Sequence, residues 1–101
     1  DIRELAATLG RLALRAVQPN PFRDRVAMVV ASAGREPVEV TVHDLRGARV
    51  ATLHRGPLPA GESSLEWDGR DAGGRTVAPG MYLVRAQSPR ETAVQRVVRV
   101  R

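Results

Sequence analysis

The sequence contains no cysteine, which excludes disulfide bonds and thiolate chemistry and leaves the redox compartment undecided. No apolar run reaches the length of about 18 residues that a transmembrane helix needs. The first residues, from Asp1 to Leu5, lack the basic-then-apolar order of a signal peptide. Because the chain begins with Asp, this absence does not exclude export.

Lysine is absent as well, so all sixteen basic side chains are Arg, against eleven acids, and the net charge is +5. A nucleic-acid surface gathers such charge on one face and interleaves aromatic side chains for base stacking. Here the arginines are spread among the acids, and the chain has only one Trp, one Tyr and one Phe. We therefore attribute the Arg content to the composition of the source genome and expect no nucleic-acid partner.

A chain of 101 residues is normally one domain with one core, and the scarcity of aromatics means that this core is mostly aliphatic. Residues 1–11 are interpreted as a linker or the tail of a preceding domain, because their helical apolar spacing is too short to be stable alone. Short strands are expected at 12–17, 26–31, 38–43, 48–53, 63–67, 81–86 and 92–100. Turn signals separate them at intervals of about 8–12 residues, which is typical of an all-β sandwich.

The strict alternation of residues 38–43 predicts which side chains face the core. Three valines are expected inside and three polar residues outside, namely Val38, Val40 and Val42 against Glu39, Thr41 and His43. The turn residues Asp44 to Gly47 predict a hairpin with 48–53. Burying both Val50 and Leu53 requires a bulge or a twist in that second strand, because the two residues are three apart.

Three further expectations concern the segments that follow. Residues 56–61 contain so much Pro and Gly that no regular structure is expected there. In the next strand, Ser63, Leu65 and Trp67 share one face. In the last strand one face carries Val94, Val98 and Val100, so that Arg96 between them must reach the rim or pair with an acid.

The stretch from Trp67 to Tyr82 is the most distinctive part of the chain, because an acidic, glycine-rich turn joins its only Trp to its only Tyr. Asp68 and Asp71 are candidate ligands for Ca²⁺, but the loop lacks the regular spacing and the distal Glu of an EF-hand. An Asx turn at Asp68 explains the same residues, with positive φ at the glycines Gly69, Gly73 and Gly74. We therefore expect no metal ion and no cofactor at this turn.

No catalytic constellation is evident in the sequence. His43 and His54 lie on the two arms of the expected hairpin, but they lack a third metal ligand and are interpreted as solvent-facing. Ser63 and Ser64 have no His–Asp partner that would activate a nucleophile. The sequence therefore predicts a protein that is not an enzyme and has no small-molecule substrate.

The aromatic residues are interpreted as parts of the scaffold. Phe22 is expected to close one end of the core, and Trp67 and Tyr82 to lie inside it. The Tyr82 hydroxyl is expected to bind a nearby backbone group, as corner tyrosines do in β-sandwiches. Exposed edge strands then offer the surface on which a partner strand adds, although their Arg side chains discourage indiscriminate pairing.

Several motifs, in order and spacing, resemble one bacterial family over about residues 12–101. They are Asn20-Pro21-Phe22, the segment 42–53, Ala60-Gly61-Glu62, the segment 65–71, Gly74 and the segment 77–85. Together they are similar to the FlgD-type immunoglobulin-like domain, first named in the flagellar hook-capping protein, and to the C-terminal sorting domains of type IX secretion cargo. The residues that carry this resemblance are Asn20, Pro21, Phe22, Asp44, Gly47, Gly61, Trp67, Asp68, Gly69, Asp71, Gly74, Gly80 and Tyr82. Two positions depart from the family pattern, because His43 stands where a Tyr is usual and Arg99 where an aliphatic residue is frequent.

The resemblance implies an immunoglobulin-like antiparallel β-sandwich of about seven strands without enzymatic activity. In the type IX version its partners are the secretion machinery at the outer membrane and an upstream cargo domain in the same chain, and the protein is secreted or held at the cell surface. Arg101 follows directly after the last expected strand, which favours this C-terminal sorting role if Arg101 is the true end. In the hook-capping version the domain is a structural interaction module or spacer. A sugar-binding sandwich is the third hypothesis, which the shortage of exposed aromatics disfavours.

Overall fold

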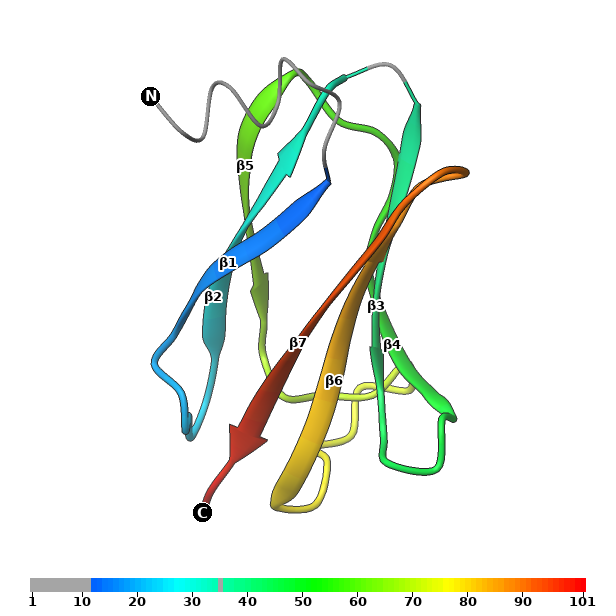
Figure 1. Cartoon of the computed structure of the whole chain (residues 1–101). Coiled ribbons are helices and arrows are strands. Elements are labelled where there is room, and N and C mark those ends of the chain that lie inside the picture. Colours follow the sequence, from blue (N-terminus) through cyan, green and yellow to red (C-terminus); the bar gives the residue numbers. More distant parts are fainter. Residues whose placement is uncertain (1–11, 35) are drawn as a thin grey trace.

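The computed structural model describes residues 12–34 and 36–101, and these residues form a two-layered β-sandwich (Figure 1). The strands are β1 (Ala13–Gln18), β2 (Val26–Ser32), β3 (Pro37–His43), β4 (Arg49–Pro57), β5 (Gly61–Trp67), β6 (Gly80–Gln87) and β7 (Thr92–Arg99). One sheet has the order β1-β2-β5 and the other the order β4-β3-β6-β7, and all neighbouring strands are antiparallel. The predicted all-β immunoglobulin-like sandwich of about seven strands is therefore confirmed.

The core lies between the two sheets and is built mainly from aliphatic side chains, as expected. The three inward valines of β3 are fully buried, and they face the alternating inward residues of β2, which are Val26, Met28 and Val30. The period of two is what allows each strand to send one row of side chains into this layer. Ser63, Leu65 and Trp67 of β5 also share the inward face, which confirms the prediction for that strand.

The predicted hairpin of β3 and β4 is present, and of the two alternatives, a bulge or a twist, its backbone has bulges at two places. The pairing shifts between Val40 and Thr41, and again between Val42 and His43, so that β4 has two extra residues. Ala51 becomes the fully inward residue of β4, while Val50 and Leu53 are half-buried and pack against the core. The bulges thus bring residues at irregular spacing to one face of the sheet.

The prediction of irregular structure at residues 56–61 is wrong at both ends. β4 continues through Gly56 and Pro57, which lie opposite Val38 and Pro37, and β5 already starts at Gly61. Proline is tolerated there because β4 is an edge strand, so a missing N–H on its outer side breaks no ladder hydrogen bond.

Thr41 was expected to face solvent, and it does lie on the outer face of β3, but it is only 1% exposed. β3 is an inner strand between β4 and β6, so Thr41 has a neighbouring strand on each side, with Thr52 of β4 directly opposite it on one of them. Arg85 of β6 lies directly opposite, and the Thr41 Oγ1 is 2.8 Å from the Nε2 of His43 on the same face. The sequence pattern fixed the face of Thr41 correctly but not its burial.

Val94, Arg96 and Val98 share one face of β7 as predicted, but that face is turned outward and not toward the core. Val97 is the buried residue of β7, whereas Val94 is 50% exposed and Val98 lies on the outer face with it. Two adjacent valines, Val97 and Val98, make both phases of the alternation possible, and a shift of one residue turns every side chain to the other face. The pairing of Val97 with the inward Tyr82 decides the phase. Arg96 is consequently exposed and needs no partner inside the core.

The expectation for residues 1–11 lies outside the described residues. Within the part of the chain that the structure describes, no helix is long and apolar enough to cross a membrane.

Candidate functional site: the aromatic corner and its carboxylate turns

The chain's three aromatic side chains meet at one end of the sandwich. The Trp67 ring lies 5.4 Å from Phe22 on one side and 5.4 Å from Tyr82 on the other, and both pairs are tilted or edge-on. Such pairs add about 0.5–1.5 kcal/mol each beyond the area that they bury. The Trp67 Nε1–H donates to the Arg70 carbonyl at 2.9 Å, so the indole also fixes the turn that follows it. Phe22 and Trp67 are almost fully buried, which places them in the scaffold.

Tyr82 anchors the other end of the same turn. Its hydroxyl donates to the carbonyl of Ala78 at 2.6 Å, four residues earlier, which confirms the expected bond to a nearby backbone group. Burial raises the pKa of Tyr82 above its ordinary value of 10.0. The positive charge of Arg99 lowers this pKa, and the negative charge of Asp44 raises it. The hydroxyl is therefore held in its neutral form, in which it can donate.

Asp71 organises the loop between the two aromatic anchors. Its Oδ1 accepts the backbone N–H groups of Gly73 at 2.9 Å and Arg75 at 3.0 Å. The backbone closes the same turn, because the Asp71 N–H donates to the Arg75 carbonyl and the Gly74 N–H to the Asp71 carbonyl. Gly74 has φ +83°, a conformation that side chains with a Cβ rarely adopt.

Asp44 repeats this turn on the neighbouring β3–β4 hairpin. The Oδ1 of Asp44 accepts the backbone N–H groups of Arg46 at 2.9 Å and Ala48 at 3.0 Å. The backbone N–H of Asp44 donates to the Ala48 carbonyl, and Gly47 has φ +88°. The shared pattern is Asp-x-x-Gly-x, which occurs as Asp44 to Ala48 and as Asp71 to Arg75. Sequence reasoning missed the repetition, although the identical spacing of Asp and Gly was a visible signal for it.

Electrostatics favour the charged form of Asp44. Partial desolvation raises its pKa, but the hydrogen bonds from Ala48 and Arg46 and the Arg46 guanidinium together lower the pKa below 3.8. A carboxylate that accepts two backbone N–H groups is stabilised in its ionised form. Asp44 therefore stabilises its turn as an anion.

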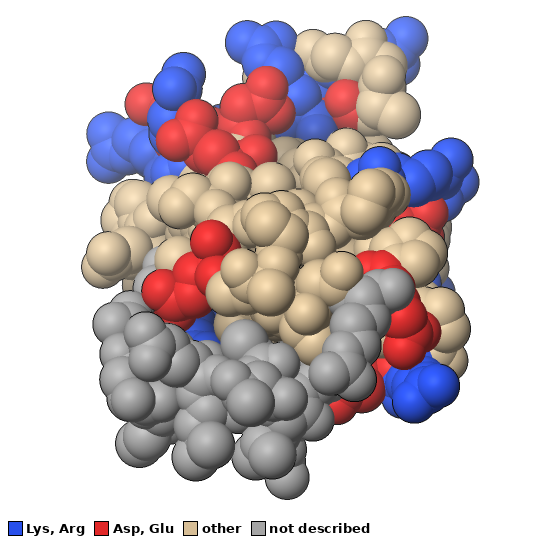
Figure 2. Space-filling view, turned by 90° about the horizontal axis from the view of Figure 1, so that it is seen from above, with Lys and Arg blue, Asp and Glu red and all other residues tan. Residues whose placement is uncertain are grey.

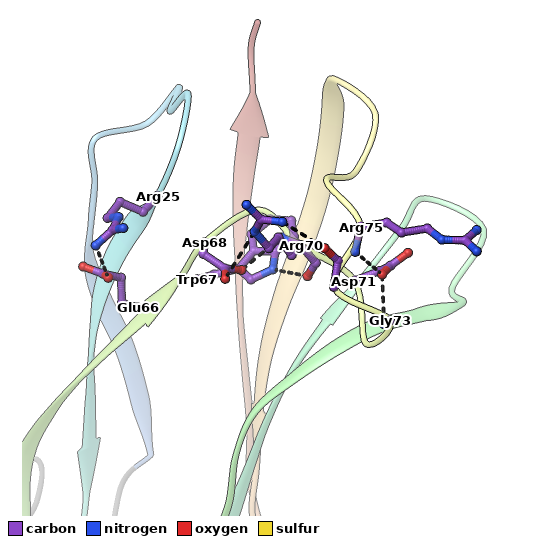
Figure 3. Close-up of polar contacts among 9 residues, drawn as sticks. Arg25, Glu66, Trp67, Asp68, Arg70, Asp71, Gly73 and Arg75 are labelled. Carbon is purple, nitrogen blue, oxygen red and sulfur yellow. Dashed lines mark hydrogen bonds and ion pairs between the residues drawn. The ribbon is translucent and has the colours of Figure 1, made fainter.

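Asp68 makes the Asx turn that was expected, since its Oδ1 accepts the Arg70 N–H at 3.1 Å (Figure 3). Gly69 and Gly74 have positive φ as predicted, but Gly73 does not. The reason is that Gly73 sits inside the Asp71 turn, at the position whose N–H the carboxylate accepts. The Arg70 guanidinium spans this loop by donating to the Gly74 carbonyl at 2.9 Å.

In both Asp44 and Asp71, the Oδ1 atom accepts backbone N–H groups of the residue's own turn. Asp44 and Asp71 line one open hollow of about 410 Å³ beside Tyr82, so the two turns are neighbours. Among the described residues, no three His, Asp or Glu side chains are grouped closely enough to hold a metal ion. The hydrogen bonds that the Oδ1 atoms of Asp68 and Asp71 accept are those of Asx turns.

Asn20 and Phe22 close the outer edge of β7. The Asn20 side chain donates to the Arg96 carbonyl and accepts the Val98 N–H, both at 3.0 Å. The backbone of Phe22 donates to the Val98 carbonyl and accepts the Val100 N–H, both at 2.8 Å. These bonds satisfy backbone groups that would otherwise invite a further strand, and Pro21 joins the two residues.

The remaining sequence candidates occupy structural positions. The two histidines bind near their own strands, His43 to Thr41 and the Gly47 carbonyl, and His54 to the Gly56 carbonyl. Gly61 and Gly80 begin β5 and β6, each with a positive φ.

Charges of both signs are mixed on the face of the molecule that Figure 2 shows. Seen from above, Arg and acidic side chains alternate around an uncharged centre and form no patch of one sign (Figure 2). Some charged side chains form ion pairs at the surface, such as Arg25–Glu66 at 3.3 Å and Arg55–Glu39 at 3.0 Å. Pairs of this kind contribute about 0–1 kcal/mol each.

Comparison with solved structures identifies similar domains within much larger proteins. The chain is similar to part of latent, dimeric PorU of Porphyromonas gingivalis, at 21% identity and a TM-score of 0.66, over 83% of this chain and 9% of that one. It is similar to part of PorZ, an essential surface component of the type IX secretion system of the same organism, at 26% identity and a TM-score of 0.57, over 84% of this chain and 11% of that one.

A third similar structure is the alkylpurine DNA glycosylase AlkC of Pseudomonas fluorescens, at 18% identity and a TM-score of 0.51, over 97% of this chain and 33% of that one. The chain thus spans about a tenth of the first two proteins and a third of this one. A fold shared by a secretion component and a DNA-binding enzyme does not itself assign a function.

Comparison with protein families is more specific than comparison with solved structures. No curated protein matches it. The FlgD Ig-like domain matches residues 24–91, which is more than half of the chain and runs from β2 to the loop before β7. Domains of this family are non-catalytic in general. The chain belongs to the FlgD Ig-like domain family.

Proposed function

We propose that residues 12–101 form a non-catalytic sorting domain that directs a larger cargo across the bacterial outer membrane. The observation that carries the proposal is the similarity to PorZ, at 26% identity over 84% of this chain, because PorZ is a surface component of a type IX secretion system. In this proposal the partners are the secretion machinery and a cargo domain in the same polypeptide, and the protein is secreted or held at the cell surface.

The chemistry of the corner supports a role of this kind. The groups that could have carried catalysis or metal binding are engaged in building turns, as with Asp71 on its own loop and Tyr82 on the Ala78 carbonyl. A domain whose polar groups stabilise its own loops is suited to being recognised as a folded surface. Recognition by contact needs a stable surface and no reactive group.

Export of a fusion protein tests the proposal. Residues 12–101 would be joined to a periplasmic reporter with its own signal peptide and expressed in Porphyromonas gingivalis. We expect the reporter on the cell surface or in the medium, and in the periplasm when the same fusion is expressed in a strain without PorZ. A folded fusion that stays in the periplasm of the intact strain contradicts the proposal.

The alternative is a structural module of the hook-capping type that spaces or docks other domains. The match to the FlgD Ig-like domain favours it. It predicts the same stable fold without any export of the reporter. Protease resistance of the periplasmic fusion, together with absence of export, would select this alternative.

A further inference from the structure

The outer face of β6 and β7 carries apolar side chains that nothing among the described residues covers. Met81 is 37% exposed and Val94 is 50% exposed, and Leu83 and Val98 beside them are half-buried. β6 and β7 lie side by side, with β7 at the edge of the four-stranded sheet (Figure 1). This face is separate from the aromatic corner, whose side chains point into the sandwich.

The pairing of β6 with β7 fixes how these side chains are arranged. Met81 lies opposite Val98, Leu83 opposite Arg96, and Arg85 opposite Val94. Since directly opposite and diagonal residues on one face are neighbours, the apolar side chains form a continuous oblique track that ends at Val94. Arg96 flanks this track on one side and Arg85 on the other.

Neither flanking arginine has an acidic partner among the residues that the structure describes. No Asp or Glu of the described residues lies within ion-pair distance of either guanidinium, in contrast to the Arg25–Glu66 pair on the other sheet. Residues 80–101 contain five of the sixteen arginines and only one of the eleven acids, Glu91. Of these arginines, Arg90 pairs with Glu36 at 3.3 Å and Arg99 donates to the Val77 carbonyl at 3.1 Å. The unbalanced positive charge on the two sides of the apolar track therefore comes from Arg85 and Arg96.

We propose that this face docks an amphipathic helix of a partner protein whose apolar stripe is flanked by Asp and Glu on both sides. A helix is about 10 Å wide, which matches two strands that lie about 4.8 Å apart. Covering a sheet face with a helix is a common way to bury it. The acids of the helix would pair with Arg85 and Arg96, and interfaces are enriched in Met and Arg.

The charge of this face argues against one other occupant, and its lack of aromatic side chains against a second. A second copy of the chain would bring the same arginines against each other, and like charges across an interface are costly. A membrane surface is usually met by aromatic side chains beside the basic ones, and this face has none. The proposal does not depend on whether the domain sorts cargo.

A fluorescent peptide tests the proposal directly. The probe is a blocked helical peptide with Leu at i, i+3, i+4 and i+7 spacing and Glu flanking the Leu stripe, and the control peptide has Lys in place of each Glu. We expect the Glu peptide to bind the chain at least about tenfold more tightly than the Lys peptide, measured by fluorescence anisotropy.

Matched variants separate this face from general attraction to a basic protein. R96E removes one flanking charge and is expected to weaken binding of the Glu peptide about tenfold, whereas R23E, the same change at an exposed residue between β1 and β2, is expected to have little effect. Trp67 fluorescence checks that both variants fold. Equal binding of the two peptides, or equal loss in the two variants, overturns the proposal. Binding to phosphatidylglycerol vesicles that R96E abolishes, without peptide binding, assigns the face to a membrane and overturns it too.

Discussion

The two Asp-x-x-Gly-x turns make Asp71 the most informative residue to change. D71A removes the acceptor of two backbone N–H groups, at 2.9 and 3.0 Å, in an exposed loop. A typical hydrogen bond contributes about 0.5–1.5 kcal/mol net, so we expect the free energy of unfolding to fall by about 1–2 kcal/mol. For a domain of this size each kcal/mol lowers Tm by about 4–8 °C. D71N keeps an oxygen acceptor at the same place and is expected to change stability little.

Thermal unfolding followed by fluorescence measures this, because Trp67 is the only Trp and is buried. D44A and D44N repeat the comparison on the second turn, and D24A serves as the control, since Asp24 is exposed. If D71N destabilises as much as D71A, backbone acceptance is not the role of Asp71. A rise of Tm in millimolar Ca²⁺ that D71N abolishes would likewise refute the reasoning, because a ligand at 100 times its Kd stabilises a protein by about 2.7 kcal/mol.

Three further predictions concern other residues. G34A is expected to lower stability more than G47A. Gly34 and Gly47 both have positive φ, but only at Gly34 would an added Cβ meet the backbone of Ala60, at 2.6 Å. Equal losses of stability in urea unfolding would contradict this. Tyr82 has a raised pKa, so its contribution to stability is complete below pH 10.0 and lost as the pH rises through the folded-state pKa. Y82F should lack that alkaline loss in unfolding measured against pH, and the prediction fails if wild type and variant lose stability in parallel. N20A should speed amide hydrogen exchange of the Val98 N–H, which the Asn20 side chain accepts, whereas N20D keeps the acceptor oxygen and should not speed it. Equal exchange rates in the two variants would show that this bond does not close the edge of β7.

Much of the fold was predictable because its signals are local. The alternation of Val38, Val40 and Val42 fixes a buried face without knowledge of any other strand, and β3 is found as predicted. The spacing of Val50 and Leu53 required a bulge or a twist, and the backbone has bulges there. Signals of this kind depend only on the period of a strand and on steric limits of the backbone.

The expectations that failed depended on neighbours distant in sequence. Pro57 could extend β4 only because that strand turned out to lie at an edge. The burial of Thr41 required that Arg85, more than forty residues later, lie opposite it. No local pattern contains either piece of information.

The same distinction holds for the candidate site. Three features could be predicted from sequence alone, because each depends on residues within a few positions. They are the Asx turn of Asp68, the positive φ of Gly69 and Gly74, and the bond of Tyr82 to the backbone. The phase of β7, and hence which of its side chains join the outward apolar track, depends on contacts between strands. Val97 and Val98 are equivalent as a pattern, and only pairing with β6 chooses which of them enters the core.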